Sequence, residues 1–322
     1  MATVPQVGPT IHAGLLYDLC PMRVIALTPA AAEIMNAIGA TDLLVGRSHE
    51  DGFPSGLAHL PVVSSAIIPS ASPAEISAAV DLAIGTSGSL YTLDIDRIRE
   101  LRPTLLITQD LCSVCSADLS AVQQLCKELT PTPAICSLNP RSIEDVFDTV
   151  VEVGQACGHA ENAARTMVAL RARFCDARDH VNPYVDGPRT AVIEWTDPLH
   201  LAGLWTPGMI AAAGGLPIGP RPGEASHAID PSILIEAKPE RIIVAPCGVG
   251  LGNIEPHLNA LRATDWWHAL PAVQNGHVQV LDGTSSFSRP GPRLIDVFEW
   301  LVPWLSDPQA SSDLQTVAAG PS

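Results

Sequence analysis

Two segments of the chain share one pattern, in which a short helix leads into a buried strand. An aspartate stands nine residues before a proline in each: Asp94 before Pro103, and Asp230 before Pro239. Aspartate is suited to cap the start of a helix, proline ends it, and the apolar run that follows is typical of a parallel strand. The alternative is a chance similarity of two helix-to-strand joints. The repeat favours two equivalent α/β lobes, and a length of 322 residues is sufficient for two domains.

A helical pattern lies between the two predicted lobes. From Ser142 onward, apolar residues recur at spacings of three and four, which predicts a helix over residues 142–180 with Gly158 as its candidate break point. Such a helix would be about 55 Å long if straight, enough to brace both lobes. The chain is therefore expected to comprise an N-terminal tail (1–22), an N-terminal α/β lobe (23–138), a linker helix (139–188), a C-terminal α/β lobe (189–305) and a disordered tail (306–322).

The charge and the apolar content limit the partners of the chain. A net charge of −16 makes binding to nucleic acid unfavourable, because phosphate backbones are repelled. The longest nearly apolar run, residues 209–220, is too short for insertion into a membrane. The first basic residue is Arg23 and the stretch before it is interrupted by proline and glycine, so we expect no secretory signal and a cytoplasmic protein with reduced cysteines. The alternatives are export to the periplasm and disulfide formation.

Loops that follow the predicted strands carry the candidate ligand contacts, since ligands of open α/β sheets bind beyond the carboxyl ends of the strands. Trp195 and Trp205 flank His200 in a segment that is rich in proline and glycine. Flat apolar walls with a few polar groups suit a large conjugated ligand. This segment therefore predicts one side of a ligand pocket.

Thiols and a histidine in other strand-end loops could hold a metal. Cys112 and Cys115 stand three positions apart, so they could share a zinc or iron ion, form a redox pair, or remain as half-buried thiols. His49 lies beside Glu50 and Asp51, where it could ligate a metal, bind an amide-rich ligand, or belong to a solvated surface loop. The sequence leaves these alternatives open.

The sequence contains none of the common signatures of catalysis. It has no G-x-S-x-G, no Walker lysine motif and no H-E-x-x-H, and the segment 85–88 lacks the dinucleotide-binding fingerprint. Glu33, at the start of a predicted helix, could act as a general acid, but a partner of the helix dipole is the commoner role. We therefore expect a protein without enzymatic activity.

Several motifs together resemble a known protein family. They are MRVIALTP at residues 22–29, EI at 33–34, LVGRS at 44–48, RPTLLI at 102–107, AGG at 213–215 and KPERIIV at 238–244. In this order and spacing the chain resembles the substrate-binding proteins of ABC importers for vitamin B12 and iron-siderophores, nearest to the cobalamin-binding members. The resemblance covers about residues 22–305, and the cysteine loop and tryptophan segment look like those of a cytoplasmic subgroup. It implies the class III fold, in which one rigid helix joins two Rossmann-like lobes and the ligand lies between them.

The resemblance also bears on docking to an importer. It implies a glutamate in each lobe, seven residues before the proline that ends a helix, which docks on transporter arginines. The corresponding positions in this chain are Asp96 and Ser232. Because one carboxylate is shortened and the other is missing, we expect weakened docking to an ABC transporter.

The sequence therefore predicts a non-enzymatic protein that holds a corrinoid, a cobalamin-like ligand, between its lobes. Residues of both lobes would contact this ligand: Phe53, Tyr91, Trp195, Trp205 and Phe287 as apolar walls, and Gln109, Asp110, Arg289 and Arg293 as polar contacts. His49, His200 or Cys112 would approach the cobalt ion. One alternative is an exported binding protein for heme, a siderophore or another metal chelate. The other is a metal-handling or redox protein that uses Cys112, Cys115 and His49 with zinc or iron.

Overall fold

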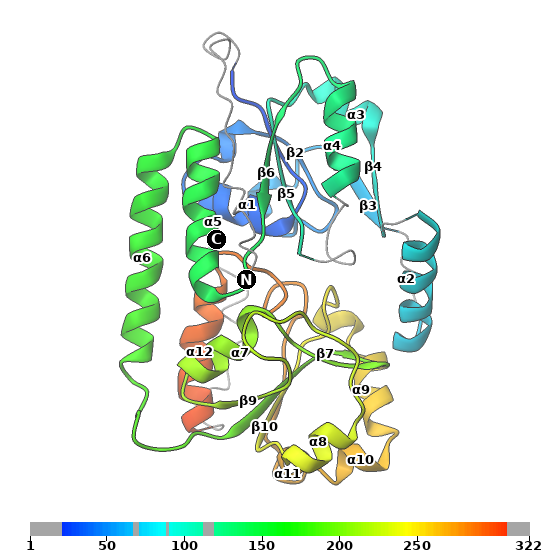
Figure 1. The fold of residues 1–322 in the computed structure, drawn as a ribbon, viewed down its shortest axis with the longest axis vertical. Helices are drawn as coiled ribbons and strands as arrows, with labels where there is room; N and C mark the ends of the chain where they lie inside the picture. The colour runs from blue at the N-terminus through cyan, green and yellow to red at the C-terminus, as the bar shows by residue number, and fades with distance from the viewer. Residues whose placement is uncertain (1–20, 67–70, 88–89, 112–118, 308–322) are drawn as a thin grey trace, which may run out of the picture.

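The computed structural model of the protein describes residues 21–66, 71–87, 90–111 and 119–307, and Figure 1 shows its two lobes one above the other. Each lobe contains a mostly parallel sheet with helices around it, which confirms the predicted α/β fold of two lobes. Cys112, Cys115 and most of both predicted tails lie outside the described residues. None of the helices in the described ranges combines the length and the apolar character that a membrane span requires.

The N-terminal lobe has a four-stranded parallel sheet in the order β2-β1-β5-β6. Alternate residues of β1 enter different cores, Val24 and Ala26 on one face and Ile25 on the other, so both faces of the sheet are covered. β3 and β4 form a separate antiparallel pair. In chain order the elements are β1 (Val24–Ala26), α1 (Pro29–Ala37), β2 (Leu44–Arg47), β3 (Ser64–Ala66), α2 (Pro73–Ser87), β4 (Tyr91–Leu93), α3 (Ile95–Leu101), β5 (Leu105–Gln109), α4 (Leu119–Glu128) and β6 (Ala134–Leu138).

The C-terminal lobe has a five-stranded sheet in the order β11-β10-β7-β8, in which β9 also pairs with β7. All pairs are parallel except β7 with β8, which is antiparallel. In chain order the elements are β7 (Arg189–Thr196), β8 (Leu199–Leu201), α7 (Trp205–Ala212), β9 (Leu216–Ile218), α8 (Ser232–Ala237), β10 (Arg241–Val244), α9 (Glu255–Arg262), α10 (Asp265–His268), α11 (Pro271–Gln274), β11 (Val278–Val280) and α12 (Leu294–Ser306).

The predicted repeat is confirmed at the level of backbone geometry. Helices α3 and α8 both end on a left-handed residue directly before the proline, Arg102 at φ 45° and Lys238 at φ 49°. Each helix buries one apolar residue completely, Ile98 in α3 and Leu234 in α8. Asp94 caps α3 as predicted, because its carboxylate accepts from the backbone N–H of the third helical residue. Asp230 does not cap α8 in this way: the cap residue is Pro231, and the Asp230 carboxylate accepts from the backbone N–H of Ser232. The two joints are therefore structural equivalents in the two lobes.

The helix predicted over residues 142–180 is interrupted at Gly158, its candidate break point, so it does not form one straight helix of about 55 Å. The segment forms two helices, α5 (Ile143–Ala156) and α6 (Ala160–Arg178), which pack against each other and reverse direction at Gly158. Gly158 has φ +79°, a conformation that glycine adopts without steric cost and that ends a helix. The helices pack so closely that a Cβ added to Gly154 would lie 2.1 Å from the Cβ of Ala163. The apolar stripes of both helices are thus buried in one hairpin.

Helix α6 alone is the connecting helix between the lobes. With 19 residues it is about 28 Å long, and its two ends are held by different lobes. In its first turns, the side chain of Thr166 donates to the carbonyl of Ala37 at the end of α1. In its last turns, Arg173 forms an ion pair with Asp296 of α12 at 2.6 Å. These contacts fix the orientation of α6 relative to both lobes, as the class III fold requires of its connecting helix.

Candidate ligand site between the lobes

Loops that follow strands of both sheets meet where the lobes touch, and we call this region the junction. Arg289, in the segment after β11, donates to the backbone carbonyl of Glu50, which follows β2, at 2.9 Å. The two partners belong to different lobes. Since ligands of open α/β sheets bind at the carboxyl ends of the strands, the junction is the candidate ligand site.

A buried ion pair also joins the lobes at the junction. Arg293, directly before α12, pairs with Glu33 of α1, whose side chain is almost completely buried. The guanidinium carbon of Arg293 also lies 4.2 Å from the centre of the Phe53 ring. Burial raises the pKa of Glu33 even beside this cation. The structure therefore gives Arg293 and Phe53 a role in holding the lobes together, and their contact with a ligand stays a prediction.

Polar and aromatic side chains of the N-terminal lobe form a connected group at the junction. The Nδ1 atom of His49 lies 2.8 Å from the hydroxyl of Ser64, and the His49 and Tyr91 ring centres are 5.4 Å apart. The hydroxyl of Tyr91 donates to the carboxylate of Glu50 at 3.2 Å. Burial lowers the pKa of His49, which keeps its imidazole neutral, the form that binds metals. His49 is thus available as a nitrogen donor to a metal-containing ligand, whereas burial and the charge of Glu50 raise the pKa of Tyr91 and keep its hydroxyl protonated.

Asp51 is a buried carboxylate that keeps one oxygen unpaired. Its Oδ2 atom accepts from the backbone N–H of Ser48 at 2.8 Å, whereas Oδ1 is buried without a hydrogen-bond partner among the described residues. Burial raises its pKa to about 7, although Arg289 acts in the opposite direction. An unsatisfied buried oxygen of this kind is suited to accept from a ligand that carries N–H groups.

The C-terminal lobe contributes a carboxylate and a thiol at the ends of neighbouring strands. The backbone N–H of Cys247, after β10, donates to the carbonyl of Glu194 in β7 at 2.9 Å. The Cys247 side chain is accessible to solvent although protein surrounds it closely. This environment, together with the charges of Glu194 and Glu50, raises the pKa of the thiol to about 12, so it remains protonated at neutral pH. Burial also raises the pKa of Glu194.

The structure brings Trp195 and His200 together but places Trp205 elsewhere. Trp195 and His200 are partners across the antiparallel β7–β8 pair, so their side chains lie on one face of the sheet. The exposed fractions of Trp205 and Phe287 are only 6% and 3%, and the indole N–H of Trp205 donates to the Phe287 carbonyl at 2.8 Å. This corrects the expectation that both rings wall the ligand, because the hydrogen bond and packing in a core that includes residues of both lobes keep them buried.

Gln109 and Asp110 occupy the end of β5 in different environments. Gln109 is buried and accepts from the hydroxyl of Thr28 at 2.9 Å. Asp110 is exposed, and its backbone N–H donates to the side chain of Asn139 at 2.7 Å. Within the described ranges, no group of three or more histidine, cysteine, aspartate or glutamate side chains could hold a metal ion. A zinc or iron site that uses Cys112, Cys115 and His49 stays a prediction.

The comparisons with known proteins agree with this architecture. The sequence pattern of the family described as periplasmic binding protein matches residues 24–284. The chain belongs to the periplasmic binding protein family. This confirms the predicted family at that level, and it makes the chain a substrate-binding protein without catalytic activity.

Solved structures of this family share the fold at low sequence identity. The apo form of the periplasmic heme-binding protein RhuT from Roseiflexus sp. RS-1 matches with a TM-score of 0.68 and 20% identity, over 89% of this chain and 99% of that chain. The periplasmic vitamin B12 binding protein BtuF of Vibrio cholerae matches with a TM-score of 0.65 and 21% identity, over 89% and 98%. No curated protein matches the sequence significantly. The predicted class III fold is thereby confirmed.

Several side chains at the junction of this periplasmic binding protein were not assigned from the sequence. In the sequence, Glu50 and Asp51 stand out only as neighbours of His49, and Glu194 and Cys247 are not among the predicted contacts. The signal that could have found them is their position, because each follows or ends a strand whose carboxyl end faces the junction. Residue type alone does not separate them from solvated carboxylates or structural thiols.

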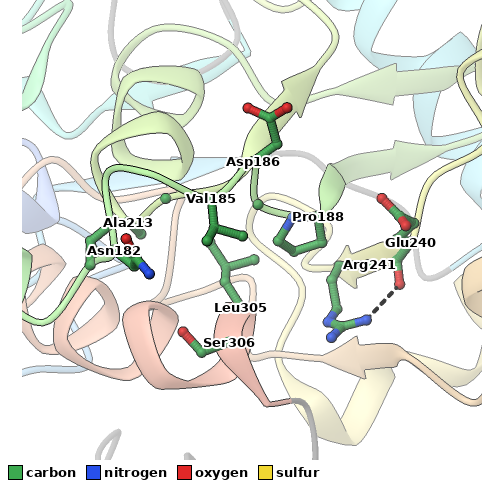
Figure 2. Close-up of a pocket in the computed structure, with 12 residues that line it drawn as sticks. Asn182, Val185, Asp186, Pro188, Ala213, Glu240, Arg241, Leu305 and Ser306 are labelled. Carbon is green, nitrogen blue, oxygen red and sulfur yellow. Dashed lines mark hydrogen bonds between the residues drawn. The ribbon is translucent and has the colours of Figure 1, made fainter.

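A groove of about 440 Å³ lies at the opposite end of the C-terminal lobe, and Figure 2 shows the residues that line it. Pro188 and Arg241 in its wall stand at the amino ends of β7 and β10, and Leu305 comes from the end of α12. Because the groove is at the amino ends of the strands, it is separate from the junction. The family fold therefore does not assign the ligand to it.

Proposed function

We propose that this periplasmic binding protein binds a corrinoid, a cobalamin-like macrocycle, at the junction between its lobes. The proposal depends on one observation, the excess of carboxylate hydrogen-bond acceptors at the junction. Glu50 and Glu194 belong to opposite lobes, the charge of each raises the pKa of the Cys247 thiol, and neither carboxylate forms an ion pair within the described part of the chain. The unpaired oxygen of Asp51 adds a further acceptor.

The chemistry of a corrinoid matches this lining. A corrinoid carries amide side chains around its ring, and their N–H groups donate to carboxylates in charge-assisted hydrogen bonds. Heme instead carries propionates, which Glu50, Glu194 and the net charge of −16 repel, whereas Arg289, which donates to the Glu50 carbonyl, would attract them. The half-buried rings of Tyr91 and Trp195 come from different lobes and would supply apolar contact to the macrocycle.

Heme or another iron chelate is the second candidate. The observation that favours it is the neutral imidazole of His49 beside the ring of Tyr91, because histidine nitrogen is a known axial donor to heme iron. Heme-binding proteins are among the structures that share the fold, but that likeness bears on the fold alone.

Titration of the purified protein with cyanocobalamin, cobinamide and hemin tests the proposal. We expect a spectral change and a calorimetric signal with the corrinoids at micromolar protein. Glu50→Gln and Glu194→Gln should each weaken corrinoid binding about fivefold, because a charge-assisted hydrogen bond becomes a neutral one. Neither should weaken hemin binding, since each removes a negative charge. Glu161→Gln, on the exposed surface of α6, is the matched control and should change neither affinity.

The outcomes of this titration separate the two candidates. Binding of hemin without any corrinoid would favour the second candidate, and binding of neither would refute the proposal. Loss of corrinoid binding in Glu161→Gln equal to that in Glu50→Gln would show that general charge, and not the junction, sets the affinity.

We further propose that docking to an ABC importer is weak and that the protein works in the cytoplasm. The Asp96 side chain is 89% exposed, but it is engaged with Arg99 at 2.7 Å, and the equivalent position in α8 is the uncharged Ser232. The docking surface thus lacks a matched pair of carboxylates. Fractionation of the native cells tests the location, and recovery of the protein from the periplasmic fraction would refute it.

A further inference from the structure

Helix α2 belongs to the N-terminal lobe by sequence but contacts the C-terminal lobe. It lies between β3 and β4 in the chain, and only Pro73 is buried among its described side chains. It contacts α9 of the other lobe. Figure 1 shows α2 at the edge of the molecule, beside the level at which the lobes meet. The helix therefore bridges the lobes from outside the two cores.

Ser77 fastens α2 to the C-terminal lobe through two hydrogen bonds. The indole N–H of Trp195 donates to the Ser77 hydroxyl at 2.7 Å, and that hydroxyl donates to the backbone carbonyl of Asp197 at 3.1 Å. Val80 and Ile84 follow Ser77 by three and seven residues, so they lie on the same side of the helix, and both are half-buried. Val80 and Ile84 thus give this side of α2 apolar surface next to the hydrogen bonds of Ser77.

The contacts between the lobes differ in how easily they open. The ion pair between Arg293 and Glu33 is buried, and separating it would leave charges without partners. The contacts of Ser77 are only partly buried or exposed, where water can replace a lost hydrogen bond. Elements with few buried contacts open more often than the cores do. Release of α2 is therefore easier than separation of the two lobes.

We propose that α2 is a clasp over the junction, that Ser77 is its latch, and that ligand enters and leaves by release of α2 with the lobes in place. The part that concerns the ligand rests on the proposed function. The clasp itself is a property of the ligand-free protein and can be tested without any ligand.

Access of a bulky reagent to Cys247 measures the clasp in the ligand-free protein. This accessible thiol is hydrogen-bonded through its backbone to Glu194, the neighbour of Trp195 in the chain. We expect Ser77→Ala and Trp195→Phe each to raise the rate at which fluorescein maleimide labels Cys247 by about fivefold to tenfold, as mass spectrometry of the peptides would show. Cys175, an exposed thiol on α6, is the internal reference and should label at an unchanged rate.

A matched substitution on the same helix serves as the control. Thr86→Ala removes a hydroxyl that donates only within α2, to the carbonyls of Leu82 and Ala83, so Cys247 should label at the wild-type rate. Melting curves check that each variant is folded. The clasp is overturned if Cys247 labels within about twofold of the wild-type rate in both Ser77→Ala and Trp195→Phe, or if Thr86→Ala accelerates labelling equally.

Release of cyanocobalamin from the loaded protein tests the role of the clasp in ligand exchange. Ser77→Ala should accelerate release by a factor similar to its effect on Cys247 labelling. Faster labelling in a protein that binds no corrinoid would support the clasp and refute the proposed function. Corrinoid binding with unchanged labelling and release in Ser77→Ala would support the function and refute the clasp.

Discussion

Replacing Arg293 with methionine removes the cation from the buried ion pair between the lobes. Methionine retains an apolar stem that can still pack on Phe53, so the substitution isolates the charge. Glu33 would be left as a buried carboxylate without an ion-pair partner, although the charge of Arg289 still acts on it. We expect the free energy of unfolding to fall by about 3–5 kcal/mol at pH 8, the usual cost of leaving one member of a buried pair alone.

The loss of stability in Arg293→Met should be smaller in acid, and the direction of this pH dependence follows from the pKa of Glu33. Burial raises this pKa above 4.5, so the folded protein takes up a proton at a higher pH than the unfolded chain does. The energetic penalty of the buried charge is therefore absent below the pKa that Glu33 has in the unfolded chain. It grows as the pH rises toward the pKa of Glu33 in the folded protein. Without Arg293 the folded pKa rises further. At pH 5 the variant should thus recover much of the stability that it lacks at pH 8.

Urea denaturation followed by tryptophan fluorescence at pH 5 and pH 8 measures these differences. The double variant Glu33→Gln with Arg293→Met leaves no buried charge at this position and should regain most of the lost stability at pH 8. The control is Arg99→Met, which removes an exposed ion pair and should change stability by less than about 0.5 kcal/mol. A loss below about 1 kcal/mol at pH 8, or an equal loss at both pH values, would refute the reasoning.

Three further substitutions test individual contacts. Trp205→Phe should lower the free energy of unfolding by about 1–3 kcal/mol in urea, because the buried carbonyl of Phe287 loses its donor; an unchanged midpoint would count against that bond. Gly154→Ala should lower the melting temperature, at a cost of about 1–3 kcal/mol, because its Cβ would clash with that of Ala163; no change would show that the helices can separate freely. Burial lowers the pKa of His257 to about 4, so the wild-type protein should lose stability as pH falls from about 6.5 toward 4. In His257→Asn this pH-dependent loss of stability should be absent. The prediction is contradicted if the melting temperature falls with pH equally in the wild-type protein and in His257→Asn.

Local patterns in the sequence predicted much of the fold. Ser142 and Asp145, three residues apart, form a capping box at the start of α5, in which each side chain accepts from the backbone of the other residue. The proline that ends each repeat is preceded by a left-handed residue, and a buried strand follows. Such signals depend on residues within one turn or one strand of each other, so the chain carries them wherever it folds. They were sufficient for the α/β class, the two lobes and the family resemblance.

The tertiary structure decided the contacts between distant segments. Gly158 marked a candidate break in the predicted helix, but periodicity is the same whether the two parts continue in line or reverse, so only packing decided that α5 and α6 form a hairpin. Tertiary packing also decided the different roles of two tryptophans that the sequence pattern treats alike. Trp205 is a core residue, whereas Trp195, ten positions earlier, donates a hydrogen bond to Ser77 of the other lobe. The sequence by itself determined which segments become helices and strands, because those preferences act locally. Which carboxylates, rings and thiol gather between the lobes depended on packing across hundreds of residues, and no local pattern records it.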